Sequence, residues 1–338
     1  MTASVLVFSL ASMGKKIYVS RYEIHSAQGL NSRSHSTTHE GALIRIEIDG
    51  VSGFGSLHPW VELGDSNLDQ LLLELENGEL SRQVKCAVHC AKVDRKARAA
   101  GVNLFTGLEV PDSHATIVRG MIGVEEAVAA GFDAVKIKMG RDVNDDIAVV
   151  KEINAAYPEL RLRLDFHAIL GAGQMEFFIK EIGEGARKHI DFIEDPLPLG
   201  EPLWERMRDT YGLKTAVDRG VAGAGGEYDF AVVKPAINHT DKICGAAQRA
   251  GRRVVVTSYM DHPIGQCYAA YSAGLMNEKY LGLINKRAGL MTHGLFLDNA
   301  YANHLGKIAT KWSSLNAEHG TGLGFDDLLE KEEWTRLV

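Results

Sequence analysis

The first third of the chain alternates hydrophobic and polar residues with a period of two, a pattern that predicts β-strands. Two such segments are IYVSRYEI at 17–24 and ALIRIEI at 42–48. The glycine-rich segment DGVSGFG at 49–55 predicts a turn, and residues 68–80 and 82–100 have the pattern of helices. We therefore expect an N-terminal α+β module in which the strands precede the helices.

Short hydrophobic strands and amphipathic helices alternate from residue 113 onward. The expected strands are ATIVRG, AVKIKM, LRLRLDF, IDFIED, KTAVD, FAVVKP and RVVVTS, and the helices between them include 143–156, 174–187, 203–211 and 241–250. Repeated β/α units with short links predict a parallel sheet. A doubly wound sheet would also fit, but polar residues end nearly every strand, which favours a closed barrel. The link at 219–228 is short and glycine-rich, so we expect no full helix there.

Charged residues end five consecutive strands of this expected barrel. They are Lys136, Lys138, Asp165, Glu194, Asp218 and Lys234. Because the carboxyl ends of barrel strands meet at one mouth, and side chains alternate between the two faces of a strand, these side chains should converge. Three converging carboxylates repel one another unless a cation lies between them, and all-oxygen ligands suit Mg²⁺ or Mn²⁺.

The lysines flank the expected metal site. A partly buried lysine beside a second cation has a lowered pKa and becomes a competent base. Lys136 would play this part for Lys138, since the two lie on one face of their strand. Lys234, on the far side of the mouth, would be a second acid/base or a fixed cation for a developing enolate.

The composition limits the classes of partner that the protein is expected to bind. The 37 basic and 44 acidic residues give a net charge of −7, which argues against nucleic acid or an anionic membrane as partner. No hydrophobic run reaches the roughly 18 residues that a membrane span needs, and a few scattered cysteines suit a cytoplasmic protein.

We expect a capping domain at 1–112, with 1–12 as an extension, a barrel at 113–300, and a C-terminal segment at 301–338 that packs back on the capping domain. The sequence leaves the oligomeric state open.

Five motifs together resemble the muconate-lactonising branch of the enolase superfamily. They are VKIKMG, RLDFH, FIEDPLP, AVD and VVKPA, and the resemblance covers nearly everything after Lys16. It implies an N-terminal α+β capping domain and a modified (β/α)7β barrel of the TIM type. The family's functional positions would fall on metal ligands Asp165, Glu194 and Asp218 and on acid/base lysines Lys138 and Lys234.

Within that branch the chain is similar to o-succinylbenzoate synthases. The segments VVKPA, VVVTSYMDHPIGQ and GFGSLHPWVELGD carry this similarity. It implies a dehydratase of menaquinone synthesis that converts 2-succinyl-6-hydroxy-2,4-cyclohexadiene-1-carboxylate to o-succinylbenzoate. The second carboxylate of such a substrate would meet the segment at 257–266, whose helix start can present backbone N–H groups. The expected substrate-binding residues are Ser258, Ile264, Gly265, Arg33 and His167.

The chain departs from the family pattern in ways that leave the reaction open. His167 stands where the family has asparagine, Arg219 where it has glutamate, and Asp261 to Pro263 where serines are common. Two lysines on opposite sides of a substrate would equally serve an N-acylamino-acid racemase, a dipeptide epimerase or a muconate cycloisomerase. The Asp-x-Asp motif of dipeptide epimerases is absent from LINKRAGL. A barrel that binds an organic acid without turnover is a second alternative.

Overall fold

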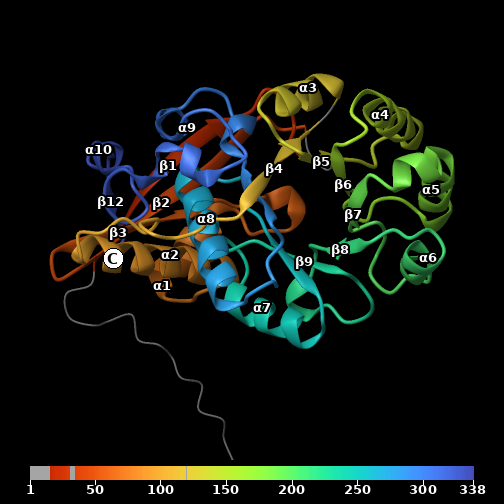
Figure 1. Ribbon diagram of the computed structural model, residues 1–338. Helices are drawn as coiled ribbons and strands as arrows, with labels where there is room; N and C mark the ends of the chain where they lie inside the picture. Colours follow the sequence, from red (N-terminus) through yellow and green to blue (C-terminus); the bar gives the residue numbers. More distant parts are fainter. Residues whose placement is uncertain (1–15, 31–34, 119) are drawn as a thin grey trace, which may run out of the picture.

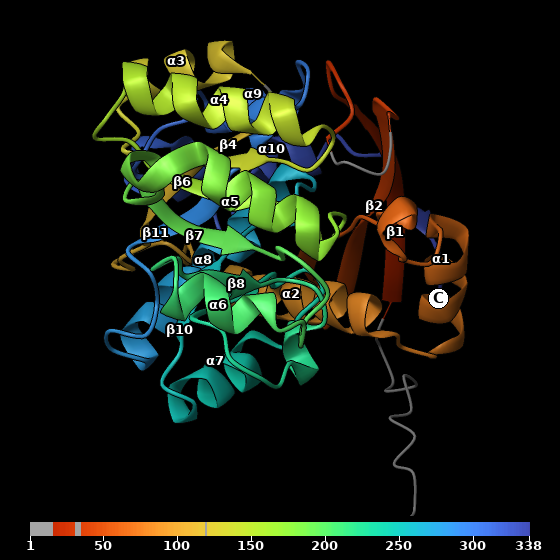
Figure 2. The ribbon, with the colours of Figure 1, turned by 90° about the vertical axis from the view of Figure 1, so that its right-hand side faces the viewer.

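The protein consists of two sheets with helices packed against them (Figure 1). The computed structural model describes residues 16–30, 35–118 and 120–338. One sheet is antiparallel, with strand order β12-β1-β2-β3, and the other is parallel, with strand order β10-β9-β8-β7-β6-β5-β4-β11. Figure 2 shows the antiparallel sheet standing beside the barrel, with α1 next to the sheet and α2 running from there towards the barrel.

The antiparallel sheet joins both ends of the described chain. Its strands are β1 (Lys16–His25), β2 (Thr38–Ile48), β3 (Val51–Leu57) and β12 (Thr335–Arg336), and it is followed by α1 (Leu68–Asn77) and α2 (Arg82–Ala99). Alternate residues of β1 and β2, such as Ile17, Ile44 and Ile46, pack with Leu71 and Val84 of the two helices in one buried cluster. The strand and helix segments expected here are therefore confirmed.

The expectation of a simple turn at 49–55 is wrong, because most of this segment is strand β3. The turn itself is confined to Asp49 and Gly50, both of which have positive φ, at 54° and 76°. Gly53 and Gly55 lie in the strand and face α2. A β-carbon on Gly53 would lie 2.2 Å from the Ala91 carbonyl oxygen, so these glycines permit close packing of the helix.

The parallel sheet is the expected barrel with seven β/α units and an eighth strand. Its strands are β4 (Asp112–Ile117), β5 (Ala134–Lys138), β6 (Arg161–Asp165), β7 (Ile190–Glu194), β8 (Thr215–Val217), β9 (Phe230–Val233), β10 (Arg253–Val256) and β11 (Arg287–Met291). The helices are α3 (Met121–Ala129), α4 (Val143–Ala156), α5 (Ala172–Arg187), α6 (Leu203–Asp209), α7 (Thr240–Arg249) and α8 (Pro263–Lys279). After β8 only a 3₁₀ turn, Val221–Gly223, takes the place of a helix, as the glycine-rich link predicted.

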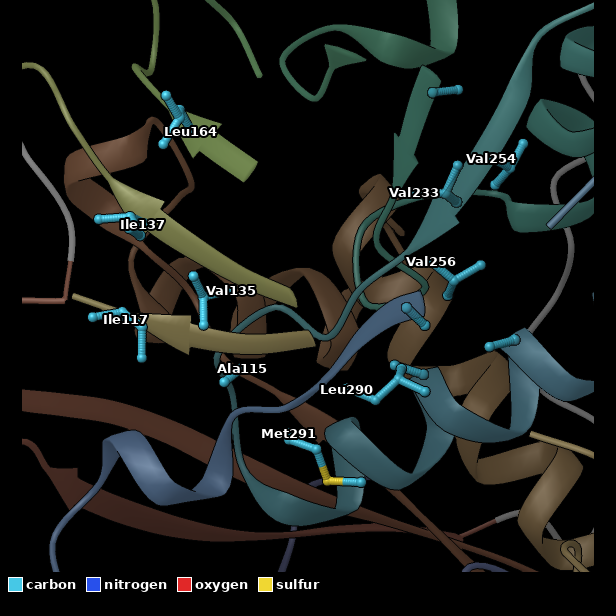
Figure 3. Close-up of a cluster of buried hydrophobic side chains, with 14 of the residues drawn as sticks. Ala115, Ile117, Val135, Ile137, Leu164, Val233, Val254, Val256, Leu290 and Met291 are labelled. Atoms are coloured by element: carbon cyan, nitrogen blue, oxygen red, sulfur yellow. The ribbon is translucent and has the colours of Figure 1, made fainter. Parts of the chain in front are cut away.

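Side-chain alternation gives each barrel strand two different faces. Outward residues such as Val135, Ile137 and Val256 belong to the large buried cluster between strands and helices (Figure 3). Interior residues of β7 to β10, among them Phe192 and Val232, form a small separate core. On β7, β8 and β9 the residues next in line on this interior face, toward the carboxyl ends, are Glu194, Asp218 and Lys234, so the fold itself carries these charges to the mouth.

The C-terminal part of the chain returns to the antiparallel sheet. It contains α9 (Ala300–Leu305), α10 (Asp326–Leu329) and short 3₁₀ turns before β12 pairs with β1. Buried Asp94 of α2 accepts hydrogen bonds from the backbone N–H groups of Phe54 at 2.8 Å and Leu323 at 2.7 Å, and its neighbour Arg98 bonds Asp326.

The domain boundaries at 112 and 300 stay predictions. Within the described ranges, no helix is long and apolar enough to cross a membrane.

Aromatic and histidine rings fill the junction between the two sheets. The centre of the Tyr22 ring lies 4.6 Å from the centre of the His262 ring, and the His262 and Tyr301 ring centres are 4.4 Å apart. The Tyr22 hydroxyl is 3.1 Å from His58 Nδ1. Burial lowers the pKa of His58 to about 3 and does the same for His262. Both rings are therefore neutral at physiological pH.

The junction should make the protein sensitive to acid. The folded pKa of His58 lies below the unfolded value of about 6.5, so the stability it contributes is complete above pH 6.5 and is lost as the pH falls towards 3. Between pH 7.5 and 5.5 the loss amounts to about 1.4 kcal/mol for one such group. Urea unfolding at both pH values should therefore show a smaller pH effect in His58→Gln than in the wild type. Exposed His25→Gln is the control and should keep the wild-type difference; equal pH effects in all three proteins would refute this account.

Candidate active site

The strand register places the charged residues side by side at the carboxyl ends of the barrel strands. Lys138 on β5 pairs with Asp165 on β6, and Asp165 pairs with Glu194 on β7. Asp218 and Lys234 follow directly after the last residues of β8 and β9. All five are thus brought together at one mouth, together with Lys136 one layer below Lys138.

The lysines and carboxylates form two groups of ion pairs, one on β5 to β7 and one at the ends of β8 and β9. Lys136 Nζ lies 2.6 Å from Glu194 Oε1 and 3.0 Å from Asp165 Oδ2. Lys138 Nζ contacts the same Asp165 oxygen at 2.8 Å. On the far side, Lys234 Nζ is 2.5 Å from Asp218 Oδ2. The two acid/base candidates therefore approach the mouth from different strands, with the carboxylates between them.

The three carboxylates at the mouth are the residues expected to hold a metal ion. Among the described residues, no group of three or more histidine, cysteine or acidic side chains is arranged to hold a metal ion. Each of the three carboxylates lies beside a lysine. Asp165 and Glu194 are buried and adjacent in register, Asp218 follows β8 directly, and all three offer the oxygen ligands that Mg²⁺ prefers. The ligand assignment stays a prediction that the chemistry of this donor set fits.

The two lysines of β5 differ in their protonation. Burial lowers the pKa of Lys138, and this effect outweighs the attraction of Asp165; the charge of Lys136 lowers the pKa further. Burial also opposes the charge on Lys136, but Asp165 and Glu194 together raise the pKa of that lysine well above its usual range. Lys136 is thus held as a cation, and Lys138 is the one of the two whose pKa is shifted towards the neutral, basic form.

His167 contacts Lys138 directly. Its Nε2 is 3.2 Å from Lys138 Nζ, and its backbone N–H donates to Asp165 Oδ1 at 3.2 Å. Burial lowers the pKa of His167 to about 3, so the ring is neutral. The residue has a positive φ of 50°, a region where asparagine and histidine are tolerated better than most residues. The replacement of the family's asparagine therefore keeps a neutral hydrogen-bonding group beside this lysine.

Asp195 supports the strand ends from behind. Its two carboxylate oxygens accept the backbone N–H groups of Asp218 at 3.0 Å and Arg219 at 3.1 Å. Burial, together with the charge of Asp218, raises the pKa of Asp195 to about 8. Through these two bonds the side chain holds the backbone that presents Asp218.

A cavity of about 30 Å³ lies next to the lysines. Its wall includes Lys136, Lys138 and Lys234, and it also contains the predicted residue Ser258. Ile264 and Gly265 are not part of this wall: the Ile264 N–H donates to His262 Nδ1 at 3.2 Å, and Gly265 lies against the Asp261 carboxylate. Arg33 falls outside the described residues. The substrate-binding roles of these four residues stay predictions.

Seven residues of the cavity wall were not individually singled out from the sequence. They are His114, Thr116, Thr257, Tyr259, Met260, Gly289 and Thr292. His114 and Thr116 are two residues apart on β4, so strand alternation alone would have placed both on the interior face. The buried His114 ring accepts a hydrogen bond from Arg163 Nη1 at 2.7 Å, a contact between strands that no local pattern reveals.

Comparisons with known proteins agree with this architecture. Residues 17–97 match the family of o-succinylbenzoate synthase N-terminal domains, and residues 123–326 match the family of enolase C-terminal domain-like barrels. The o-succinylbenzoate synthase of Bdellovibrio bacteriovorus is 32% identical over 334 residues, covering 95% of this chain and 98% of that protein.

Solved structures show the same fold. The L-Ala-D/L-Glu epimerase of Bacillus subtilis in a substrate-liganded complex has a TM-score of 0.76 at 18% identity and covers 91% of this chain and 97% of its own. A dipeptide epimerase of Methylococcus capsulatus, complexed with Mg and a dipeptide, has a TM-score of 0.66 at 15% identity, with 92% and 99% covered. The chain belongs to the enolase superfamily, in its muconate-lactonising branch. Within that branch it is similar to the o-succinylbenzoate synthases in both domains.

Proposed function

We propose that the protein dehydrates 2-succinyl-6-hydroxy-2,4-cyclohexadiene-1-carboxylate to o-succinylbenzoate, a step of menaquinone synthesis. The observation that carries this proposal is the similarity of the N-terminal domain, as well as the barrel, to o-succinylbenzoate synthases. The lysines on two sides of one carboxylate cluster fit the chemistry. A small organic carboxylate is accordingly the proposed substrate, and no nucleic acid or membrane partner is proposed.

Three carboxylates would hold the metal that this chemistry needs. We assign Asp165, Glu194 and Asp218 to Mg²⁺, with Mn²⁺ as the other oxygen-preferring candidate. When bound, such an ion supplies Lewis acidity to a substrate carboxylate. Lys136, which bridges Asp165 and Glu194 in this structure, would help to orient both carboxylates, and its charge favours their ionised form.

The lysines would carry the proton transfers. Neutral Lys138 Nζ takes the proton from the carbon α to the carboxylate, and the electron pair of that C–H bond forms the enediolate. Lys234, as a cation, stabilises the negative charge that develops. Protonated Lys138 then returns its proton to the departing hydroxyl group on the same face, so that the C–O bond breaks and water leaves. The ring becomes aromatic, which drives the step forward.

The related fold of the epimerases keeps one alternative open. A racemase or epimerase would use the same two lysines, one to remove the α-proton and the other to return it from the opposite face. This chemistry would need no leaving group. The N-terminal domain match favours the dehydration, because the family matched at residues 17–97 is that of o-succinylbenzoate synthases.

Substrate preference tests the proposal. With purified protein and Mg²⁺, we expect kcat/KM for the cyclohexadiene carboxylate to exceed that for N-succinyl amino acids, N-acetyl amino acids and muconate by tenfold or more, about 1.4 kcal/mol of transition-state discrimination. A preference of the same size for an amino-acid derivative or for muconate would overturn the dehydratase assignment and leave membership of the superfamily intact.

A further inference from the structure

Tyr259 lies between Lys234 and the N-terminal domain. It follows Ser258 just beyond β10, lines the cavity beside the lysines and is only 5% exposed. The centre of its ring is 5.5 Å from Lys234 Nζ, within the distance at which an aromatic face attracts a cation. Lys234 is thus restrained by the Asp218 carboxylate on one side and by this ring on another.

The segment 60–65 of the N-terminal domain holds Tyr259 at two points. Trp60 Nε1 donates to the carbonyl oxygen of Tyr259 at 2.9 Å, and the Tyr259 hydroxyl donates to Asp65 Oδ2 at 2.9 Å. The same Asp65 oxygen accepts the backbone N–H of Trp60 at 2.8 Å. Main chain and side chain of one barrel residue are therefore both bonded to one short segment of the other domain.

Segment 60–65 is held by a turn and hydrogen bonds of its own. Leu63 N–H donates to the Trp60 carbonyl oxygen at 2.9 Å, and Gly64 closes the turn with a φ of 102°. Trp60 is 1% exposed and packs with Ile24, Tyr259 and other apolar residues in a cluster formed by both domains. Docking of the N-terminal domain thus excludes water from the two hydrogen bonds that hold Tyr259.

We propose that Tyr259 is a positioning residue through which docking of segment 60–65 fixes Lys234 for the transition state. The inference rests on the proposed function, because it assigns Lys234 the role given there. Segment 60–65 resembles the capping-domain loop of the family, and its part here is to hold a barrel residue that in turn restrains a lysine. If the hydrogen bond to Asp65 is lost, the Tyr259 ring can move. The ring then no longer restrains the position of the Lys234 ammonium group.

The test compares Tyr259→Phe with a matched tyrosine variant. Tyr259→Phe keeps the ring but removes the bond to Asp65. Tyr301→Phe removes a comparable bond, from Tyr301 to Glu332 at 2.8 Å, and Tyr301 does not line the cavity beside the lysines. Because a misplaced group affects the transition state more than substrate binding, we expect kcat to fall about tenfold in Tyr259→Phe while KM changes less than about twofold. Asp65→Ala should behave similarly, and Tyr301→Phe should match the wild type.

A double variant separates positioning from a structural role. If Tyr259 acts through Lys234, adding Tyr259→Phe to Lys234→Ala should cause no further loss of kcat, because the group being positioned is already gone. Additive losses, a wild-type kcat in Tyr259→Phe, or a change confined to KM would each overturn the proposal.

Hydrogen exchange distinguishes this failure from failure of the proposed function. If the wild type does not turn over the cyclohexadiene carboxylate, the dehydratase proposal fails and the contact is judged by exchange alone. Tyr259→Phe should then raise exchange at the amides of 60–65 by about fivefold or more, with no rise in Tyr301→Phe. Unchanged protection of that segment would overturn the coupling itself.

Discussion

Lys138→Ala is expected to lower kcat by about 10³-fold or more and to abolish exchange of the substrate α-proton with solvent deuterium. The reason is that Lys138 lies at the mouth beside Asp165, and that burial and the charge of Lys136 shift its pKa downwards, towards the form that accepts a proton. The measurement is turnover in parallel with NMR observation of the α-proton in D₂O. An unchanged rate of either process would show that the base has been misassigned.

Two neighbouring lysines provide the comparison for this variant. Lys234→Ala should reduce turnover through lost stabilisation of the enediolate, by about 3 kcal/mol if it resembles a single oxyanion donor. Lys136→Ala should be milder and should raise the apparent basic pKa of the pH–rate profile, because a positive charge that lowers the pKa of Lys138 is removed. The three variants should therefore fall in the order Lys138, Lys234 and Lys136, from the largest loss to the smallest.

Removal of divalent metal is expected to abolish activity almost completely, and Mg²⁺ or Mn²⁺ should restore it. Asp165, Glu194 and Asp218 are oxygen donors at one mouth. Without a cation bound to them, the site would have no Lewis acid to polarise a substrate carboxylate. Exhaustive dialysis against EDTA followed by metal titration measures this effect. Full activity after chelation would remove the metal from the account.

The individual carboxylates should be tested with variants that keep their shape. Asp165→Asn, Glu194→Gln and Asp218→Asn should each lower kcat by about 10²-fold or more while the protein stays folded. The corresponding alanine variants are less clean, since Asp165 also pairs with Lys136 and Lys138 and its removal leaves buried charge. Surface Glu184→Gln serves as the control. Calorimetric Mn²⁺ binding gives a readout independent of turnover, and wild-type affinity in all three variants would contradict the ligand assignment.

Strand alternation explains why so much of the barrel could be predicted. In β5, outward Val135 and Ile137 alternate with inward Lys136 and Lys138, and the next strand repeats the pattern up to Asp165. A polar residue inside a hydrophobic strand is conspicuous, and its distance from the strand end fixes its level in the barrel. The order of the strands then places the charges at one mouth without further information.

Contacts between distant segments account for what the sequence could not reveal. Gly53 and Gly55 have the composition of a turn, and only the approach of α2, about forty residues later, makes them part of a strand. The bond between Asp65 and Tyr259 joins residues 194 positions apart. Similarly, the bond from the Ile264 N–H to His262 Nδ1 could not be foreseen from the local pattern of the helix start; the expected anion site there stays a prediction.

The central claim is that this mouth dehydrates a cyclohexadiene carboxylate, and formation of the aromatic product tests it most directly. Purified protein with Mg²⁺ would be incubated with 2-succinyl-6-hydroxy-2,4-cyclohexadiene-1-carboxylate, and the product followed by ultraviolet absorbance and identified by mass spectrometry. The account predicts conversion to o-succinylbenzoate, with the loss of one water from the substrate mass, in the wild type and not in Lys138→Ala. Failure of the wild type to form this product, while it exchanges the α-proton of an N-acyl amino acid, would contradict the claim.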